Sequence, residues 1–542
     1  MAFLTSPGTQ VQEIDNSSII PPVAAANAAT VGMFNWGPVL EIVIVDTTDE
    51  LASNFGKPTN ANYLDFMCAS SFLAYANNLQ IVRVVHSDAL NATATASAGG
   101  SGLLIQNLAI YQQANFSSSS NLWVAKCPGI LGNNLGVAWA DNATFNAVDS
   151  NGLPTWPYHG LFSTQPGTGH FHIVVYDFVG GITGLAGSVL ETFPFCSANL
   201  NDLNFDGTSA YVSNVINNES QWLWIGKEAL LTGGQAGVNL AGGVDGSAVV
   251  DGDREAGWAL FADVENVDVD LIFAAGAGIN TAQYMLQDIA AVRKDCVGFV
   301  SPLLTDVVYQ TPTVSLTNSK TTRTTYGDTS YGFMDSNWKL MYDRYNDVNR
   351  WVPLNGDTAG LAAQATNTND AWWSPAGYNR GNIKNCIKLA YAQSQSIRDA
   401  LYQAGINPCV SFPNQGPILY GDKTMQTLPS AFDRIGVRRL FLVLEKAISQ
   451  AAKYQLFEFN DDITRAKFVN MVQPFLDTIR GRRGLQKAVV VCDATNNTDE
   501  IVSSNQFVAS IFVLPNYSIN YITLSFVAEN SGVQFDEDVV RA

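Results

Sequence analysis

The sequence predicts a mixed α/β fold of several domains. At 542 residues the chain is too long for one ordinary hydrophobic core, so about two to four domains are expected. A strand, a helix and a second strand follow one another between residues 270 and 300, at a spacing typical of parallel strand pairing. Beyond residue 380, three segments repeat apolar residues at helical spacing, and strand-like segments follow them.

Composition limits the classes of function that the chain could have. Hydrophobic residues make up 47% of the chain and charged residues 14%, which excludes a disordered protein. The net charge of −19 argues against a general nucleic-acid binder, since such proteins carry a basic surface. Neither a signal peptide nor a membrane span is expected, because no basic, apolar leader and no long apolar run occur. The seven scattered cysteines predict free thiols in a reducing compartment.

The first half of the chain predicts an extended arm followed by α/β and β-rich segments. Prolines at both ends separate residues 1–22 from the rest and disfavour helix there. Residues 87–120 are rich in Ala, Ser, Thr, Asn and Gly, which indicates a linker or a small β insertion. The expected strands are 29–34, 41–45, 80–85, 135–139 and 170–178, and the expected helix is 63–75.

The second half predicts the strand–helix–strand unit and a strongly patterned C-terminal region. The unit comprises strand 270–274, helix 281–294 and strand 296–300. A helix is expected from Asn382 to Leu401, since its apolar residues share one face and Gly405 and Pro408 follow. Pro474 is expected to kink the last helix. The remaining expected elements are helices 437–451 and 464–483 and strands 487–492, 507–514 and 519–527, with an acidic segment at 533–538.

Three groups of residues could carry chemistry, and each has a structural explanation that we favour. Gly276 and Gly278 could begin a dinucleotide-binding turn, but Thr281 stands where the third glycine belongs. His170 and His172 could ligate a metal from one strand face, but no third ligand is near. Four carboxylates without calcium-loop spacing indicate a solvated face: Asp263, Glu265, Asp268 and Asp270.

No catalytic residue, cofactor site or metal site is therefore expected. The sequence holds no GxSxG turn, no Walker A loop and no HExxH pair. The absence of these motifs argues against an enzyme but does not exclude one, since catalytic groups can be far apart in sequence.

One basic cluster stands out from the acidic background. It lies on or just after the third C-terminal helix and comprises Arg465, Lys467, Arg480, Arg482 and Arg483. Arg438 and Arg439 lie on the preceding helix. The cluster could serve helix solubility and complement the helix dipole, or it could form a basic strip that faces an acidic partner. The sequence leaves both interpretations open.

An ordered series of motifs resembles the tail sheath proteins of contractile bacteriophages. The match spans nearly the whole chain and is most specific from 350 to 527. The motifs in order are Ser6-Pro7-Gly8, Gly37-Pro38, Val82-Arg83-Val84, Pro128-Gly129 with Gly132-Asn133, Asp206-Gly207, Asp245-Gly246, Val352-Pro353, Trp373 to Gly377, Gly405 to Pro408, Tyr420-Gly421, Val437 to Leu440, Phe457 to Asp461, Cys492-Asp493 and Ile519 to Ile522. One departure is that the extra outward domain of the longest members is reduced or absent near 87–120.

The resemblance implies a structural, self-assembling protein and not an enzyme. Sheath subunits form hexameric rings that stack helically around a tail tube, and rigid-body rearrangement of subunits contracts the stack and drives the tube through the host envelope. The implied partners are copies of the chain, the tail tube protein, and baseplate and tail terminator proteins, with no cofactor, no nucleic acid and no membrane insertion. The implied location is the virion tail, after assembly in the host cytoplasm.

The resemblance also implies how the chain is divided. A core domain is built from both chain ends, with an inserted middle domain and extended terminal arms. The implied segments are an arm at 1–25, a tube-proximal core at 26–86 plus 350–515, an inserted outer part at 87–349 and a C-terminal strand and arm at 516–542. The arms add strands to neighbouring subunits. The expected inter-subunit strand residues are Val11, Glu13, Ile14, Ile522, Leu524, Phe526, Val533 and Phe535.

Two alternatives from other classes are an intracellular enzyme with a nucleotide-type βαβ domain near 260–300 and a capsid-like shell protein. Under the sheath interpretation, the basic helix residues Arg465, Lys467, Arg480, Arg482 and Arg483 are the candidates for contact with the tube.

Overall fold

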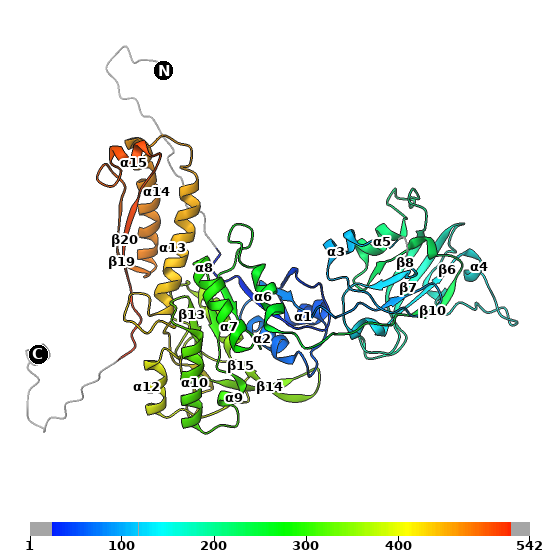
Figure 1. The fold of residues 1–542 in the computed structure, drawn as a ribbon, viewed down its shortest axis with the longest axis horizontal. Coiled ribbons are helices and arrows are strands. Elements are labelled where there is room, and N and C mark those ends of the chain that lie inside the picture. The colour runs from blue at the N-terminus through cyan, green and yellow to red at the C-terminus, as the bar shows by residue number, and fades with distance from the viewer. Residues whose placement is uncertain (1–23, 117–118, 522–542) are drawn as a thin grey trace, which may run out of the picture.

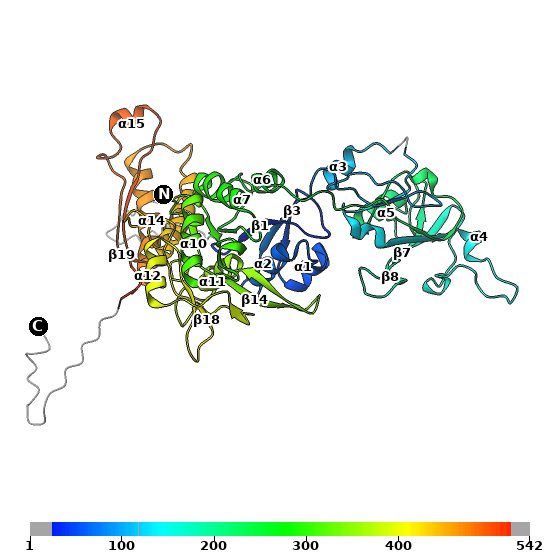
Figure 2. The same cartoon turned by 60° about the horizontal axis from the view of Figure 1, so that its bottom comes forward.

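The computed structural model describes residues 24–116 and 119–521. The molecule is elongated, with a β-rich lobe at one end and a long helical pair at the other (Figure 1). The turned view shows the same separation, with the central sheet and its helices between the two ends (Figure 2).

A six-stranded sheet lies in the middle of the molecule and joins distant parts of the chain. Its strand order is β13-β12-β11-β1-β3-β2, and neighbouring strands are parallel except β2, which runs antiparallel to β3. The strands are β1 (Ala28–Gly32), β2 (Ile42–Val45), β3 (Leu79–Arg83), β11 (Leu271–Phe273), β12 (Val297–Val300) and β13 (Gly332–Met334). The strands expected at 29–34, 41–45 and 80–85 and the parallel unit at 270–300 are therefore confirmed.

Both faces of this sheet are covered, because alternate residues of each strand point to opposite sides. Phe72 and Phe273 stack on one face at a centroid distance of 5.7 Å. Trp258 and Met285 are buried on the other. The covering helices are α2 (Tyr63–Leu73) and α11 (Asn355–Thr368) on the first face, and α6 (Asp251–Ala259), α7 (Ile279–Tyr284) and α10 (Pro312–Tyr326) on the second.

The β-rich lobe contains two small sheets that pack around a separate core. The sheets have the orders β10-β6-β7-β8 and β4-β5-β9, and the core includes the tilted pair Trp123 and Trp139. The strands are β4 (Thr93–Ala94), β5 (Trp123–Ala125), β6 (Leu135–Ala140), β7 (His170–Asp177), β8 (Ser188–Ser197), β9 (Leu223–Ile225) and β10 (Gln235–Asn239). The strands expected at 135–139 and 170–178 are confirmed, and β4 places part of 87–120 in this lobe.

The helix expected from Asn382 to Leu401 is wrong over most of its length. Ile387 N–H donates to Leu340 O and Ala390 N–H donates to Trp338 O, each at 2.8 Å, so this segment lies along the edge of a strand. A helix begins only at Gln395. The backbone N–H groups of this segment bond to the open edge of the strand at 338–343, in place of the hydrogen bonds they would make within a helix. The elements here are β14 (Trp338–Asp343), β15 (Val348–Pro353), β16 (Lys388–Leu389), α12 (Gln395–Gln403), β17 (Cys409–Ser411) and β18 (Pro417–Leu419).

The C-terminal region forms a helical pair backed by a two-stranded sheet, as the apolar patterning predicts. Leu444, Phe468 and Leu476 belong to its core. The elements are α13 (Ile435–Lys453), α14 (Asp462–Gly481), β19 (Leu485–Val491) and β20 (Ser510–Pro515). Helix α14 continues through Pro474, and the kink there stays a prediction. Residues 519–521 are not in a strand, and the rest of the strand expected at 519–527 lies outside the described residues.

The other short elements connect these parts. They are α1 (Thr48–Phe55), α3 (Leu108–Gln113), α4 (Asn142–Phe145), α5 (Val212–Glu219), α8 (Ala291–Arg293), α9 (Leu304–Val307), α15 (Asp499–Ser503), a π-helix (Met285–Ala290) and three 3₁₀ turns (Ile130–Asn134, His159–Leu161 and Glu228–Leu230). The domain boundaries stay a prediction. The βαβ unit, assigned to the inserted part, shares one sheet with strands of the first segment.

Candidate assembly surfaces

The helical pair is fixed to the central sheet by buried cations from α13. The Arg439 guanidinium donates to Ala362 O at 2.8 Å, to Ala25 O at 2.9 Å and to the Thr366 hydroxyl at 2.6 Å. Burial lowers the pKa of Arg439 to about 10. Arg438 is also buried, where it lies 3.8 Å from the centroid of the Phe432 ring. Both arginines therefore serve the interior and offer no charge to a partner.

The acidic cluster at 263–270 is only partly a solvated face. Lys446 Nζ of α13 lies 2.9 Å from Asp270 Oδ1 and also pairs with Asp268. Asp270 is buried, and burial raises the pKa of its carboxyl to about 6 despite the attraction of Lys446. The expectation of a solvated face is wrong for Asp270, because α13 covers it.

The basic cluster divides into two groups at opposite ends of α14. Arg465 is buried near the start of the helix, where it donates to Asn460 Oδ1 at 2.9 Å and pairs with Asp462 at 3.1 Å. Lys467 is exposed. Arg480 stands 15 positions after Arg465, so the two groups lie about 22 Å apart along the axis.

The group at the end of α14 is exposed and surrounded by aromatic residues. Arg480 pairs with Asp477 at 3.1 Å. Arg482 pairs with Asp370 and lies 5.6 Å from the centroid of Trp372, and Arg483 lies 5.8 Å from that of Trp373. These three arginines, with Lys467, are the members of the predicted cluster whose side chains reach solvent.

An open groove of about 1030 Å³ begins beside these arginines. We call it the aromatic groove, and sequence reasoning missed it, because its walls come from segments that are distant in sequence. Arg380 lies 5.1 Å from the centroid of Trp373 on one wall. Residues 516–521 form part of another. The residues that line it include Trp372, Trp373, Tyr378, Arg380, Arg398 and Tyr420.

The predicted arm residues lie outside the described part of the chain. They are Val11, Glu13, Ile14, Ile522, Leu524, Phe526, Val533 and Phe535. The β19–β20 sheet is a candidate acceptor for added strands. Within the described residues each of these strands has one partner, namely the other. Each strand therefore has an open edge of the kind that pairs with further strands.

The glycine turn at Gly276 does not provide a phosphate site. The carboxylate of Asp65 accepts from Gly276 N–H at 2.9 Å and from Met33 N–H at 2.8 Å, and pairs with Arg254 at 2.7 Å. A Cβ at Gly276 would lie 2.5 Å from Leu64 Cβ. A buried protein carboxylate thus occupies the position that an anionic ligand would take.

The histidine pair is structural. His172 is buried and stacks on Phe162 at a centroid distance of 4.2 Å. Its Nδ1 accepts from Phe195 N–H at 3.2 Å, so its Nε2–H donates to Thr164 O at 2.7 Å. Both ring nitrogens are occupied, and His170 lies 4.0 Å from Asp202 instead. Among the described residues, no three His, Cys, Asp or Glu side chains converge to hold a metal ion.

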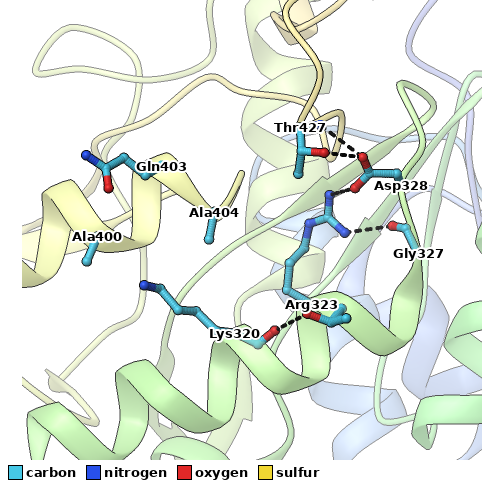
Figure 3. Close-up of a pocket in the computed structure, with 9 residues that line it drawn as sticks. Lys320, Arg323, Gly327, Asp328, Ala400, Gln403, Ala404 and Thr427 are labelled. Carbon is cyan, nitrogen blue, oxygen red and sulfur yellow. Dashed lines mark hydrogen bonds and ion pairs between the residues drawn. The ribbon is translucent and has the colours of Figure 1, made fainter.

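A smaller pocket of about 500 Å³ lies between α10 and α12. Figure 3 shows that the Arg323 side chain points toward Asp328 and the Gly327 carbonyl, while Lys320 extends toward α12. Arg323 donates to Gly327 O and to Asp328 Oδ1, each at 2.7 Å, and the Thr427 hydroxyl also donates to Asp328. These contacts hold the 327–328 turn to the loop at 427.

Two further observations concern the cysteines and the helices. The seven cysteines are free, and all but Cys386 are buried. In the part of the chain that the structure describes, no helix has the length and apolar character that a bilayer span requires.

Sequence comparison decides the family. Residues 248–425 match the phage tail sheath protein central domain, and residues 427–529 match the phage tail sheath C-terminal domain. The tail sheath protein of Salmonella phage ViI is 31% identical, over 99% of this chain and 98% of the relative. The chain belongs to the phage tail sheath family. It is a structural protein of a contractile phage tail sheath and a component of the virion tail.

Another sheath relative supports the family, and two solved structures share the fold. The tail sheath protein of Enterobacteria phage T4 is 31% identical, over 98% of this chain and 99% of the relative. Its alignment runs over 659 positions, so the relative contains insertions that this sheath subunit lacks. A sheath tail protein from Listeria innocua shares the fold at a TM-score of 0.55 and 12% identity, covering 92% of this chain and 97% of that one. A sheath tail protein from Desulfitobacterium hafniense shares the fold at a TM-score of 0.53 and 13% identity, covering 94% of this chain and 100% of that one.

Proposed function

We propose that this sheath subunit assembles into hexameric rings that stack around a tail tube, and that contraction needs no nucleotide. The observation that carries the proposal is the two-stranded β19–β20 sheet, whose open edges lie on the helical pair at one end of the molecule (Figure 1). Strands from neighbouring subunits would complete this sheet through main-chain hydrogen bonds.

The surface of the β19–β20 sheet supports this role. Val489, Phe512 and Leu514 are exposed on it, although the opposite side packs on α14. Two-stranded sheets are marginal alone, and exposed apolar edge strands favour pairing with another chain. Added arm strands from 1–25 and 516–542 would cover both the edges and these side chains. The arms would also keep subunits linked while rings rotate past one another during contraction.

The contact with the tube is proposed for Lys467, Arg480, Arg482 and Arg483. Their side chains are exposed, whereas Arg465 is used inside the helical pair. Exposed charges give register and steering more than irreversible affinity, which suits a contact that is released on contraction. Reversal of Lys467 and Arg482 to Glu should weaken assembly on purified tubes and leave tube-free polymerisation intact. Lys453→Glu, an exposed reversal on α13, is the matched control.

The other parts of the proposal follow from the same assembly. The subunits are made in the host cytoplasm, contact baseplate and tail terminator proteins at the ends of the stack, have no enzymatic activity, and bind neither nucleic acid nor membrane. Negative-stain microscopy of the purified chain tests the central claim. Hollow or striated cylinders of six-fold symmetry are expected. Closed shells would support the capsid alternative, and discrete monomers or dimers that are stabilised by a nucleotide would support the enzyme alternative.

A further inference from the structure

The loop between α13 and α14, together with the first turn of α14, presents an exposed apolar surface, which we call the tip. Five large apolar side chains of residues 454–463 are exposed there: Tyr454, Leu456, Phe457, Phe459 and Ile463. Phe457 is 106% exposed, as much as in an extended chain. Single exposed apolar residues are ordinary, but a contiguous group rimmed by polar residues marks an interaction site.

The tip is also acidic. Glu458 lies between the two phenylalanines and is exposed, with no ion pair among the described residues. Asp461 caps α14 by accepting from Thr464 N–H at 2.8 Å, and Asp462 pairs with Arg465. A partner for the tip should therefore offer apolar or aromatic surface together with a cation that Glu458 can meet.

The aromatic groove offers this combination. Tyr378 and Tyr420 line the groove and are exposed, and their ring centroids lie 6.2 Å apart. The guanidinium of Arg380 lies over Trp373, and Arg398 lies 5.5 Å from the centroid of Phe412. Aromatic side chains and arginine are the residues that most often dominate protein interfaces. Such a groove can take phenyl rings edge to face and a carboxylate on its arginines.

We propose that the tip of one subunit docks into the aromatic groove of a second copy of this chain. The two surfaces lie at opposite ends of α14, whose 20 residues span about 30 Å. A subunit cannot therefore fill its own groove with its own tip. The contact joins two different patches, so each subunit has one donor and one acceptor surface, and repetition generates a ring or an open helical stack.

This contact rests on the proposed self-assembly and adds a residue-level interface to it. It uses neither strand edges nor residues 1–23, although residues 516–521, where the C-terminal arm begins, form one wall of the groove. Arg480 and Arg483 line one side of the groove and are also proposed to contact the tube. The variants that test the docking therefore leave both arginines unchanged.

The first test compares two phenylalanines that are equally exposed. Phe457→Ala should raise the concentration needed for tube-free polymerisation at least tenfold, whereas Phe205→Ala, at a position that is 111% exposed in the β-rich lobe, should leave it unchanged. Neither side chain is packed, so both variants should melt at the wild-type temperature. Equal polymerisation of the two variants would overturn the proposal.

The second test maps the contact with cysteines. Phe457→Cys combined with Tyr378→Cys, treated with a short bis-maleimide in assembled cylinders, should give a ladder of covalent dimers, trimers and higher oligomers. Each single variant and the wild type should give no ladder, since all but one of the native cysteines are buried. Intact cylinders without a ladder would refute the docking and leave the proposed sheath function standing. Absence of cylinders from the wild-type chain would instead refute the sheath assembly.

Other occupants of the groove give distinct products. Linkage of Tyr378→Cys to Phe535→Cys in place of Phe457→Cys would mean that the groove holds the acidic C-terminal segment, and the proposal would be wrong. Linkage of Phe457→Cys to the tube protein, without a ladder in tube-free cylinders, would assign the tip to the tube and would equally overturn it.

Discussion

Lys446 of helix α13 and Asp270, the residue directly before strand β11, form an ion pair across 176 residues of sequence, with 2.9 Å between Nζ and Oδ1. Asp270 also accepts from Asn27 N–H at 3.1 Å, next to strand β1. The pair therefore ties the C-terminal helical pair to the two central strands of the main sheet.

Removal of Lys446 should destabilise the fold. Lys446→Met leaves Asp270 buried without its cation, and breaking such a pair typically costs about 3 kcal/mol. Urea unfolding should show this decrease in the free energy of unfolding. Lys453→Met, at the exposed end of the same helix, should change it by less than about 0.5 kcal/mol. The double variant Lys446→Met with Asp270→Asn should recover part of the loss; no recovery would mean that the pair is not the cause.

Local patterning predicts the elements of this region well, because amphipathic periodicity is a property of neighbouring residues. It predicts helix α13 to within a few residues and the parallel pairing of β11 with β12. It fails for the segment after Asn382, because the open edge of β14 competes with the helix for backbone hydrogen bonds. Helical spacing alone cannot show that a strand edge lies nearby.

The site residues were less predictable, because burial of a charge depends on distant partners. Arg465 and Lys467 look alike in sequence, yet only Arg465 turns back to Asn460 and Asp462. The Asp65 carboxylate at Gly276 comes from 211 residues away. No sequence signal joins Trp373 with Tyr420 in one groove. The tip does have a local signal, since Phe457 and Phe459 stand in a short segment between two helices.

The turn at Gly276 should tolerate no added side chain and should not bind nucleotides. Gly276→Ala should lower the melting temperature, because its Cβ would lie 2.5 Å from Leu64 Cβ. Millimolar ATP or NAD should give no shift in the melting temperature of the wild-type chain, since a ligand that binds the native state stabilises it in proportion to the logarithm of its concentration. A concentration-dependent rise with either nucleotide would contradict the structural role of this turn.

Stability should fall with rising pH through the titration of Asp335. This residue is fully buried, and burial raises the pKa of its carboxyl to about 8, although the Ser301 hydroxyl at 2.5 Å and Asn337 N–H at 3.1 Å favour the charged form. The ordinary pKa of Asp in an unfolded chain is about 3.9. Between these values the native chain binds a proton that the unfolded chain does not.

The stabilisation that the protonated Asp335 gives the native state is therefore complete below about pH 4. Between about pH 4 and about pH 8 the free energy of unfolding falls by roughly 1.4 kcal/mol per pH unit, and above about pH 8 this stabilisation is lost. Asp335→Asn keeps the shape and cannot ionise. Its free energy of unfolding, measured by urea titration from pH 5 to 9, should depend less on pH than that of the wild type. Parallel pH profiles of the two proteins would show that Asp335 is not the titrating group.

Deletion of residues 1–20 should separate folding from assembly. Ala24 and Ala25 remain in this variant, and their carbonyl oxygens accept hydrogen bonds from Lys446 and Arg439, so the attachment of α13 is kept. Among the described residues, the hydrophobic cores begin at Ala26, which the deletion keeps. We expect a monomer with the wild-type melting temperature that forms no cylinders, because it lacks the strand that would pair with the open edge of a neighbour's β19–β20 sheet.

Deletion of residues 1–26 should in addition lower the melting temperature. This variant loses the carbonyl oxygens of Ala24 and Ala25, so the buried Arg439 loses one of its acceptors. Cylinders formed by the 1–20 deletion would show that the arm is not the link between subunits, and would leave the tip and the aromatic groove as the contact to examine.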